Sequence, residues 1–253
     1  MVKKLFILFK IARKLALSDA LKIVSKVHKP PLIIKILVSL FSVTFSKNNN
    51  ETNKLTNETN KLTDEEKLCT SIQGMGTTFI KLGQFLSTRP DIIGVKLATH
   101  FEELQDRLPP FSTSEAKEIV KESLGNKIFD SIIDFEEPVA AASIAQVHKA
   151  RIKDDGVIKD VAIKILRPNI KKTFNDEIDA LMLLAYFIES LVSKTKRLKL
   201  VEVVFLLKEI TNHEMDLRFE AAAANELYEN TKSDFGFNVP KIYWNYTTKK
   251  ILT

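Results

Sequence analysis

Alternation of side-chain character over residues 161–165 constrains the fold of this chain more than any other feature. Successive side chains of a β-strand point to opposite faces of the sheet. The three β-branched residues of this stretch therefore share one face, while Ala162 and Lys164 share the other. We expect the apolar face to pack against a core, and Lys164 to point its ammonium group away from that core.

A run of small residues lies upstream of this strand: Ala140, Ala141, Ala142 and Ser143. A hairpin turn at residues 154–156, Asp-Asp-Gly, is expected to connect the intervening strand to the lysine strand. Protein-kinase-like folds hold the α- and β-phosphates of a nucleotide with such a strand lysine and small-residue loop. The pattern therefore predicts a phosphate site, although a tight turn of small residues is the plainer interpretation of the loop alone.

Composition and charge narrow the classes of function. The chain has 253 residues, of which 45% are hydrophobic, and this is enough for a substantial core. Its only cysteine, Cys69, allows no intrachain disulfide and favours a reducing compartment. Residues 1–47 hold ten Lys or Arg and one acidic residue, so the basic charge belongs to the first segment. The remainder shows no basic stripe with interleaved aromatic residues, and we expect no nucleic-acid partner.

Residues 1–45 form a basic segment in which positions 3–29 carry apolar residues at helical spacing. Such a helix can lie on a membrane surface with anionic lipids. Two alternatives stay open, namely a helix that packs on the protein itself and an organelle transit peptide. No apolar run is long enough to predict a membrane-spanning helix.

Residues 46–63 contain the heptamer NETNKLT twice in tandem and are expected to form a polar, low-complexity linker. Residues 64–134 are expected to form a helical extension, and residues 135–253 an α+β domain. The predicted helices run from Asp64 to about Ser87–Pro90, from Asp91 to about Asp106, from Ser112 or Thr113 to Leu124, over about Lys171–Val192 and over about Val201–Asn230. The predicted strands lie near Phe135–Ala140, Ser143–Ile152, Lys159–Leu166, Lys241–Tyr246 and Lys250–Thr253.

Four motifs occur together in the order found in one family. They are Lys81-Leu82-Gly83-Gln84, Ala140-Ala141-Ala142-Ser143, Ala162-Ile163-Lys164 and Glu214-Met215-Asp216. With these motifs the chain resembles the N-terminal half of a UbiB/ADCK-type atypical kinase, a protein-kinase-like family linked to ubiquinone biosynthesis. The resemblance covers residues 64–253 and implies a kinase-like small lobe with about five antiparallel strands and long helices, preceded by a helical extension. The large lobe is expected to be absent from this chain.

The resemblance also implies roles for individual residues. The alanine-rich loop replaces the Gly-rich loop of ordinary kinases, and is expected to be stiffer because each Cβ removes access to positive φ. Glu220 is the expected carboxylate partner of Lys164, and Asp216 is expected to share a helix face with Glu220. The family's extension helix covers the nucleotide cleft, so Lys81 and Gln84 are expected to meet Glu214 or Asp216 there. The implied cofactor is ATP or ADP with Mg in a weak or incomplete site.

Several other residues are expected to have no catalytic role. Asp234-Phe235-Gly236 spells the metal-binding triplet of kinases, but precedes a predicted small-lobe strand and is interpreted as coincidence. No metal-ligand cluster is predicted. His148, Arg151 and Arg167 are expected to be edge or surface residues of the strands.

The first functional hypothesis is the nucleotide-binding part of an atypical kinase or ATPase of ubiquinone biosynthesis, not catalytic as this chain alone. Under this hypothesis the protein is expected to be a peripheral membrane protein on the cytoplasmic face of a bacterial inner membrane. The alternative location is the mitochondrial inner membrane. Expected partners are the membrane surface, a separate large-lobe chain or ubiquinone-biosynthesis proteins. The second hypothesis is a truncated or split-gene remnant that acts only as a membrane-surface binding module or has no function. The third is an unrelated helical scaffold.

Overall fold

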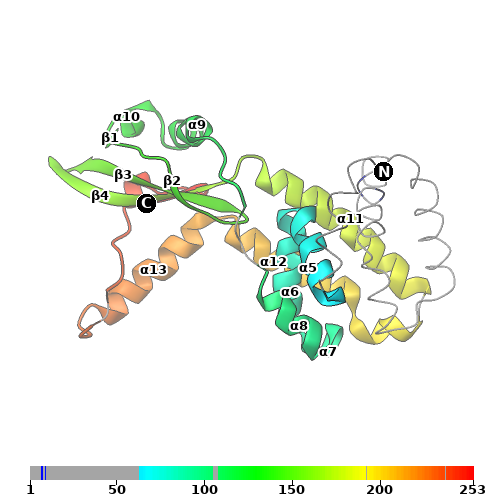
Figure 1. The fold of residues 1–253 in the computed structure, drawn as a ribbon. Helices are drawn as coiled ribbons and strands as arrows, with labels where there is room; N and C mark the ends of the chain where they lie inside the picture. Colours follow the sequence, from blue (N-terminus) through cyan, green and yellow to red (C-terminus); the bar gives the residue numbers. More distant parts are fainter. Residues whose placement is uncertain (1–6, 8, 10–62, 105–107, 192, 237) are drawn as a thin grey trace. The chain divides into compact units, whose positions relative to one another are not determined.

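The computed structural model describes residues 7, 9, 63–104, 108–191, 193–236 and 238–253 (Figure 1). The basic segment, the tandem heptamers and the interpretations attached to them lie outside these residues, apart from Ile7 and Phe9. By its internal contacts the chain forms two compact units, residues 1–105 with 174–208, and residues 106–173 with 209–253. This division does not coincide with the expected boundary after residue 134. No helix among the described residues has the length and apolarity needed to cross a membrane.

In the first unit, short helices follow one another where the sequence predicted two longer ones. They are α5 (Asp64–Met75), α6 (Thr77–Ser87), α7 (Pro90–Ile93) and α8 (Val95–Glu102). Thr63 starts α5 with a capping box to Glu66. Gly76 and Gly94 separate the helices, because each takes a positive φ that ends a helical run. Their core is built on Leu68, Phe101 and Leu104.

Two long helices, α11 (Ile170–Leu191) and α12 (Leu200–Glu214), belong to both units and are joined by the 3-10 helix η1 (Ser193–Leu198). The third helix of this region, α13 (Leu217–Thr231), lies wholly in the second unit. The sequence predicted one helix over 201–230. Instead the chain breaks at Met215-Asp216, because Asp216 takes an extended conformation (φ −127°, ψ 92°) and caps α13.

The second unit is built on a five-stranded antiparallel sheet, as expected. Its strands are β1 (Ile132–Ile133), β2 (Pro138–Ala141), β3 (Ala145–Asp154), β4 (Val157–Leu166) and β5 (Ile251–Leu252). The strand order is β1-β3-β4-β5, and β2 also pairs with β3. The strand predicted over 241–246 is wrong, because this stretch ends in a 3-10 turn, η2 (Trp244–Tyr246), and the fifth strand is β1 instead.

The long hairpin β3–β4 organises this unit. Asp155 and Gly156 both take positive φ at the turn, as a two-residue hairpin loop requires. The face that carries Ile152, Ile163 and Ile165 is fully buried and packs against α9 (Thr113–Leu124). In Figure 1, α9 and the short helix α10 (Asn126–Phe129) lie on one side of the sheet, and α13 lies on the other. The alternation predicted for residues 161–165 is therefore confirmed, and Lys164 belongs to the face opposite the core.

Candidate functional site

Lys164 and Glu220 form the centre of the candidate site. The Lys164 ammonium donates to both Glu220 carboxylate oxygens, at 2.7 Å each. β4 supplies the lysine through its pleat, and the first turn of α13 supplies the glutamate. Their side chains are 30% and 49% exposed, so the pair is open to solvent and to a ligand. The predicted partnership is confirmed as a contact, while its role toward a nucleotide stays a prediction.

The alanine-rich segment is partly strand and partly turn. Ala140 and Ala141 belong to β2 and pair with Val147 and Gln146 of β3. Ala142–Ile144 forms the turn, closed by a bond from the Ala142 amide to the Ala145 carbonyl at 2.8 Å. None of these turn residues takes positive φ, which explains why alanine is compatible with a position where kinases use glycine.

The four loop residues are not equally accessible. Ala140 is exposed, Ala141 and Ala142 are half-buried, and Ser143 is fully buried. The side chain of Ser143 is enclosed by the fold in this structure, and its expected contact with a ligand stays a prediction. A backbone contact from the three alanines stays a prediction.

Asp216 is the N-cap of α13 and forms an ion pair with Arg218. As the cap of α13 it lies outside the helix, so the expected shared face with Glu220 is wrong. Arg218 donates to both of its carboxylate oxygens, at 2.9 and 2.7 Å, and the Lys249 ammonium lies 3.6 Å away. The Arg218 hydrogen bond is the largest cause that lowers the pKa of Asp216, to about 2. Asp216 is thus a buried, ionised cap.

The other motif acids and bases lie in different units. Lys81 and Gln84 are half-buried on α6, and the Gln84 amide donates to the Leu104 carbonyl at 3.3 Å. Glu214 is exposed at the end of α12, in the second unit. Contact between Lys81 or Gln84 and Glu214 or Asp216 therefore stays a prediction.

His148 and Arg167, which the sequence placed at the surface, are buried or half-buried, and this expectation is wrong for both. His148 is fully buried on β3, with Nδ1 at 2.8 Å from the Glu136 carbonyl and Nε2 at 2.8 Å from the Gln146 amide nitrogen. Burial is the main cause that lowers its pKa. Gln146, His148, Ala150 and Ile152 share the buried face, so period-two alternation could have found this position. Arg151 is exposed and pairs with Asp134, as expected for a surface residue.

Asp234-Phe235-Gly236 forms an exposed turn after α13, with Phe235 fully open to solvent. The interpretation of this triplet as a coincidence stays a prediction. Among the described residues, no group of three or more His, Cys, Asp or Glu side chains could hold a metal ion.

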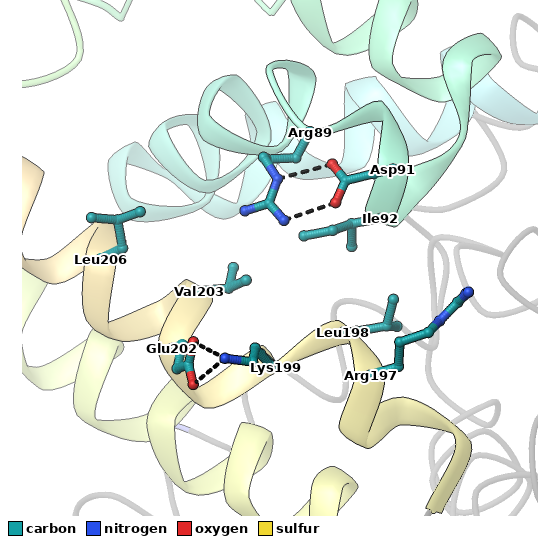
Figure 2. Close-up of a pocket in the computed structure, with 9 residues that line it drawn as sticks. All are labelled: Arg89, Asp91, Ile92, Arg197, Leu198, Lys199, Glu202, Val203 and Leu206. Carbon is teal, nitrogen blue, oxygen red and sulfur yellow. Dashed lines mark hydrogen bonds and ion pairs between the residues drawn. The ribbon is translucent and has the colours of Figure 1, made fainter.

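The first unit contains a separate pocket of about 330 Å³ (Figure 2). Two ion pairs lie in its wall, Arg89 with Asp91 at 2.8 Å and Lys199 with Glu202 at 3.0 Å. Its apolar lining comes from Ile92, Leu198, Val203 and Leu206, and the Arg197 guanidinium points away from them. We assign it no part in the site around Lys164, whose residues belong to the second unit.

Comparison with known proteins decides the family. The model of the ABC1 atypical kinase-like domain matches residues 103–253, which is more than half of the chain. The chain belongs to this family. Its α+β fold with a five-stranded antiparallel sheet is accordingly that of a kinase-like small lobe with long helices.

Bacterial members of the family are similar over most of the chain. "Probable protein kinase UbiB" of Marinobacter nauticus is 37% identical over 183 residues, covering 72% of this chain and 33% of that protein. The proteins of the same name from Pseudomonas aeruginosa and Cellvibrio japonicus are 39% identical over 183 residues and 38% identical over 181 residues. They are covered to 34% and 32% of their length, against 72% and 71% of this chain. The chain thus spans about a third of the length of these relatives.

Proposed function

We propose that this chain binds ATP or ADP through Lys164 and the alanine-rich loop, as the nucleotide-binding part of an atypical kinase or ATPase of ubiquinone biosynthesis. The observation that carries the proposal is the bidentate ion pair between Lys164 and Glu220. A helix carboxylate that fixes the strand lysine is one of the two arrangements that kinase-type phosphoryl transfer requires. Family membership and the names of the relatives support the same assignment.

The geometry suits a phosphate group. Glu220 holds the ammonium at the sheet face, and the side chains there remain partly exposed, so a phosphate oxygen can approach the remaining N–H donor of Lys164. The adjacent loop carries only methyl side chains at Ala140, Ala141 and Ala142, so a ligand can reach its backbone. Magnesium bound with the nucleotide would neutralise phosphate charge, while Lys164 orients the α- and β-phosphates.

Calorimetric titration of the chain with Mg-ATP and Mg-ADP tests this proposal. Lys164→Met removes the ammonium and keeps the length of the side chain. We expect it to weaken binding by about tenfold or more, because a charge-assisted hydrogen bond contributes roughly 1.5–3 kcal/mol. Lys153→Met is the matched control, since Lys153 lies on the same face of the sheet near the hairpin turn. Equal affinities of wild type and Lys164→Met would refute the assigned role of Lys164.

The cellular role is a separate part of the proposal. In a cell that depends on this chain, loss of its gene should lower ubiquinone content, and wild type should restore it better than Lys164→Met. Restoration by both forms to the same level would argue against a nucleotide-dependent role in quinone synthesis.

The basic segment supports a proposed membrane partner. Its apolar stripe and its excess of Lys and Arg suit adsorption to anionic lipid. Flotation with vesicles of phosphatidylglycerol and phosphatidylethanolamine should recover the full chain, and deletion of residues 1–47 should reduce recovery. Unchanged flotation of the deleted form would refute membrane binding by this segment.

A further inference from the structure

Arg167 lies directly after β4, and its side chain bonds to three backbone carbonyls. Nε donates to the Ala142 carbonyl at 3.0 Å. The terminal nitrogens donate to the carbonyls of Pro109 at 3.0 Å and Leu108 at 3.3 Å. One guanidinium group therefore joins two segments that are distant in sequence, namely the alanine-rich loop and residues 108–111.

The main chain of Arg167 also forms a hydrogen bond with the turn that follows the alanines. Its amide donates to the Ile144 carbonyl at 2.9 Å. The carbonyls of Ala142 and Ile144, at the two ends of the turn, are thus both held by one residue. These two bonds add to the bond from the Ala142 amide to the Ala145 carbonyl, which closes the turn itself.

Residues 108–111, which we name the connector, are the first described residues after Leu104 and lead into α9. A second clamp holds the end of the connector. The Gln146 side chain accepts from the Phe111 amide at 2.9 Å and donates to the Phe111 carbonyl at 3.1 Å. The Gln146 side chain, on β3, bonds to the connector and to His148 of the same strand, but not to the alanine-rich loop. Arg167 bonds to both the connector and the loop.

We propose that Arg167 is a positioning residue that couples the connector to the alanine-rich loop, so that displacement of the connector changes the loop. Its consequence for nucleotide binding rests on the proposed function, but the coupling itself concerns only two backbone segments. Arginine suits this role because its planar fork presents five donors in fixed directions. Lysine carries the same charge on a single nitrogen and cannot reach three carbonyls with the same geometry.

Hydrogen exchange of backbone amides measures the coupling without any ligand. Arg167→Lys should speed exchange in peptides covering residues 140–146 and in peptides covering residues 108–113, each on the order of tenfold. The matched control is Arg151→Lys, an exposed arginine of β3 that should leave both segments unchanged. Faster exchange in one segment alone, or in neither, would overturn the proposal. A urea titration of each variant separates local opening from global loss of stability.

A double-mutant cycle separates coupling from two independent contacts. Pro109→Ala with Pro110→Ala loosens the connector at two exposed positions. With Arg167 in place, this connector variant should also speed exchange in residues 140–146 by several-fold. In the Arg167→Lys background it should add nothing to exchange of that loop. Equal effects of the connector variant in both backgrounds would refute coupling through Arg167.

Nucleotide titration distinguishes the two proposals. If the chain binds nucleotide, Arg167→Lys should change the ratio of the Mg-ATP and Mg-ADP dissociation constants by several-fold, with Lys164 intact. An unchanged ratio would refute the consequence for binding. If the wild type binds neither nucleotide, the proposed function fails, while the exchange measurements still decide whether Arg167 couples the two segments.

Discussion

The ammonium of Lys164 lies 2.7 Å from both carboxylate oxygens of Glu220, yet both side chains are substantially exposed. Exposed ion pairs contribute little to folding because water and salt screen them. We therefore expect the double-mutant coupling energy of Lys164→Met and Glu220→Gln to be below about 1 kcal/mol in urea unfolding. A small value means that the fold does not depend on this pair, so that its loss can be tested at the site without unfolding the chain.

A coupling energy above about 2 kcal/mol would contradict this interpretation and would mean that the pair stabilises the sheet against α13. The matched control is a surface ion pair between Glu229, in the last turn of α13, and Lys232, directly after that helix. These two side chains are 2.8 Å apart and also exposed. Both cycles should give similar, small coupling energies. The two cycles together also show whether loss of nucleotide binding in Lys164→Met can be explained by unfolding.

Gly83, the glycine of the Lys81–Gln84 motif, is buried at a close approach between α6 and Leu104. A Cβ at this position would overlap the Leu104 Cδ1 atom. Gly83→Ala should therefore lower the free energy of unfolding by about 1–2 kcal/mol, since overpacking outweighs the better helix propensity of alanine. Gly74→Ala on α5 is the control, because a Cβ there meets nothing within 4 Å. That control should be neutral or stabilising, and equal losses in both variants would argue against the packing explanation.

Asp216 should make stability depend on pH in the acid range. Arg218 lowers the pKa of this carboxyl from 3.8 to about 2. Because the folded pKa is below the unfolded one, the carboxylate stabilises the fold above about pH 4, and this contribution is lost as pH falls toward 2. We expect Asp216→Asn to remove roughly 1–2 kcal/mol of that pH dependence, allowing for the exposure of Arg218.

Urea titrations at several pH values between 2 and 5 measure this difference. The matched control is Asp91→Asn. Arg89 donates to both carboxylate oxygens of Asp91, as Arg218 does to Asp216, and the two residues of each pair are two positions apart, but Asp91 is exposed. The stability difference between wild type and Asp91→Asn should vary less with pH. If the difference between wild type and Asp216→Asn were constant over this range, the assigned cause of the low pKa would be wrong.

Sequence periodicity predicted the strands of the hairpin well, because a strand with one buried face must alternate. Lys164 and its face followed from that rule, and the pairing with Glu220 followed from the family resemblance. The helix break at Asp216 was missed, although aspartate is a strong helix N-cap. Apolar residues continue on both sides of this position, and helical spacing alone cannot show that the chain turns there.

The missed polar residues have a common physical cause. His148 and Arg167 are polar residue types, and such residues are mostly exposed, so composition places them at the surface. Their burial depends on backbone carbonyls from segments far along the chain, Glu136 for His148 and residues 108, 109 and 142 for Arg167. The position of His148 on the buried face of β3 follows the period-two alternation of that strand. The hydrogen bonds of Arg167, which lies after the end of β4, leave no such periodic signal in the sequence.

His148 should contribute a second pH dependence, close to neutrality. Burial lowers its pKa, so the unfolded chain takes up the proton first as pH falls below about 6.5, and stability decreases. The neutral ring fits its partners, because Nδ1–H can donate to the Glu136 carbonyl while Nε2 accepts from the side-chain amide of Gln146. The two bonds of Gln146 to the Phe111 backbone fix the orientation of that amide.

We expect the free energy of unfolding to fall by up to about 1.4 kcal/mol per pH unit below pH 6.5 in wild type. His148→Gln should be less stable at pH 8 but lose this slope, whereas His213→Gln at an exposed position should retain it. Equal slopes in wild type and His148→Gln would mean that another group causes the dependence.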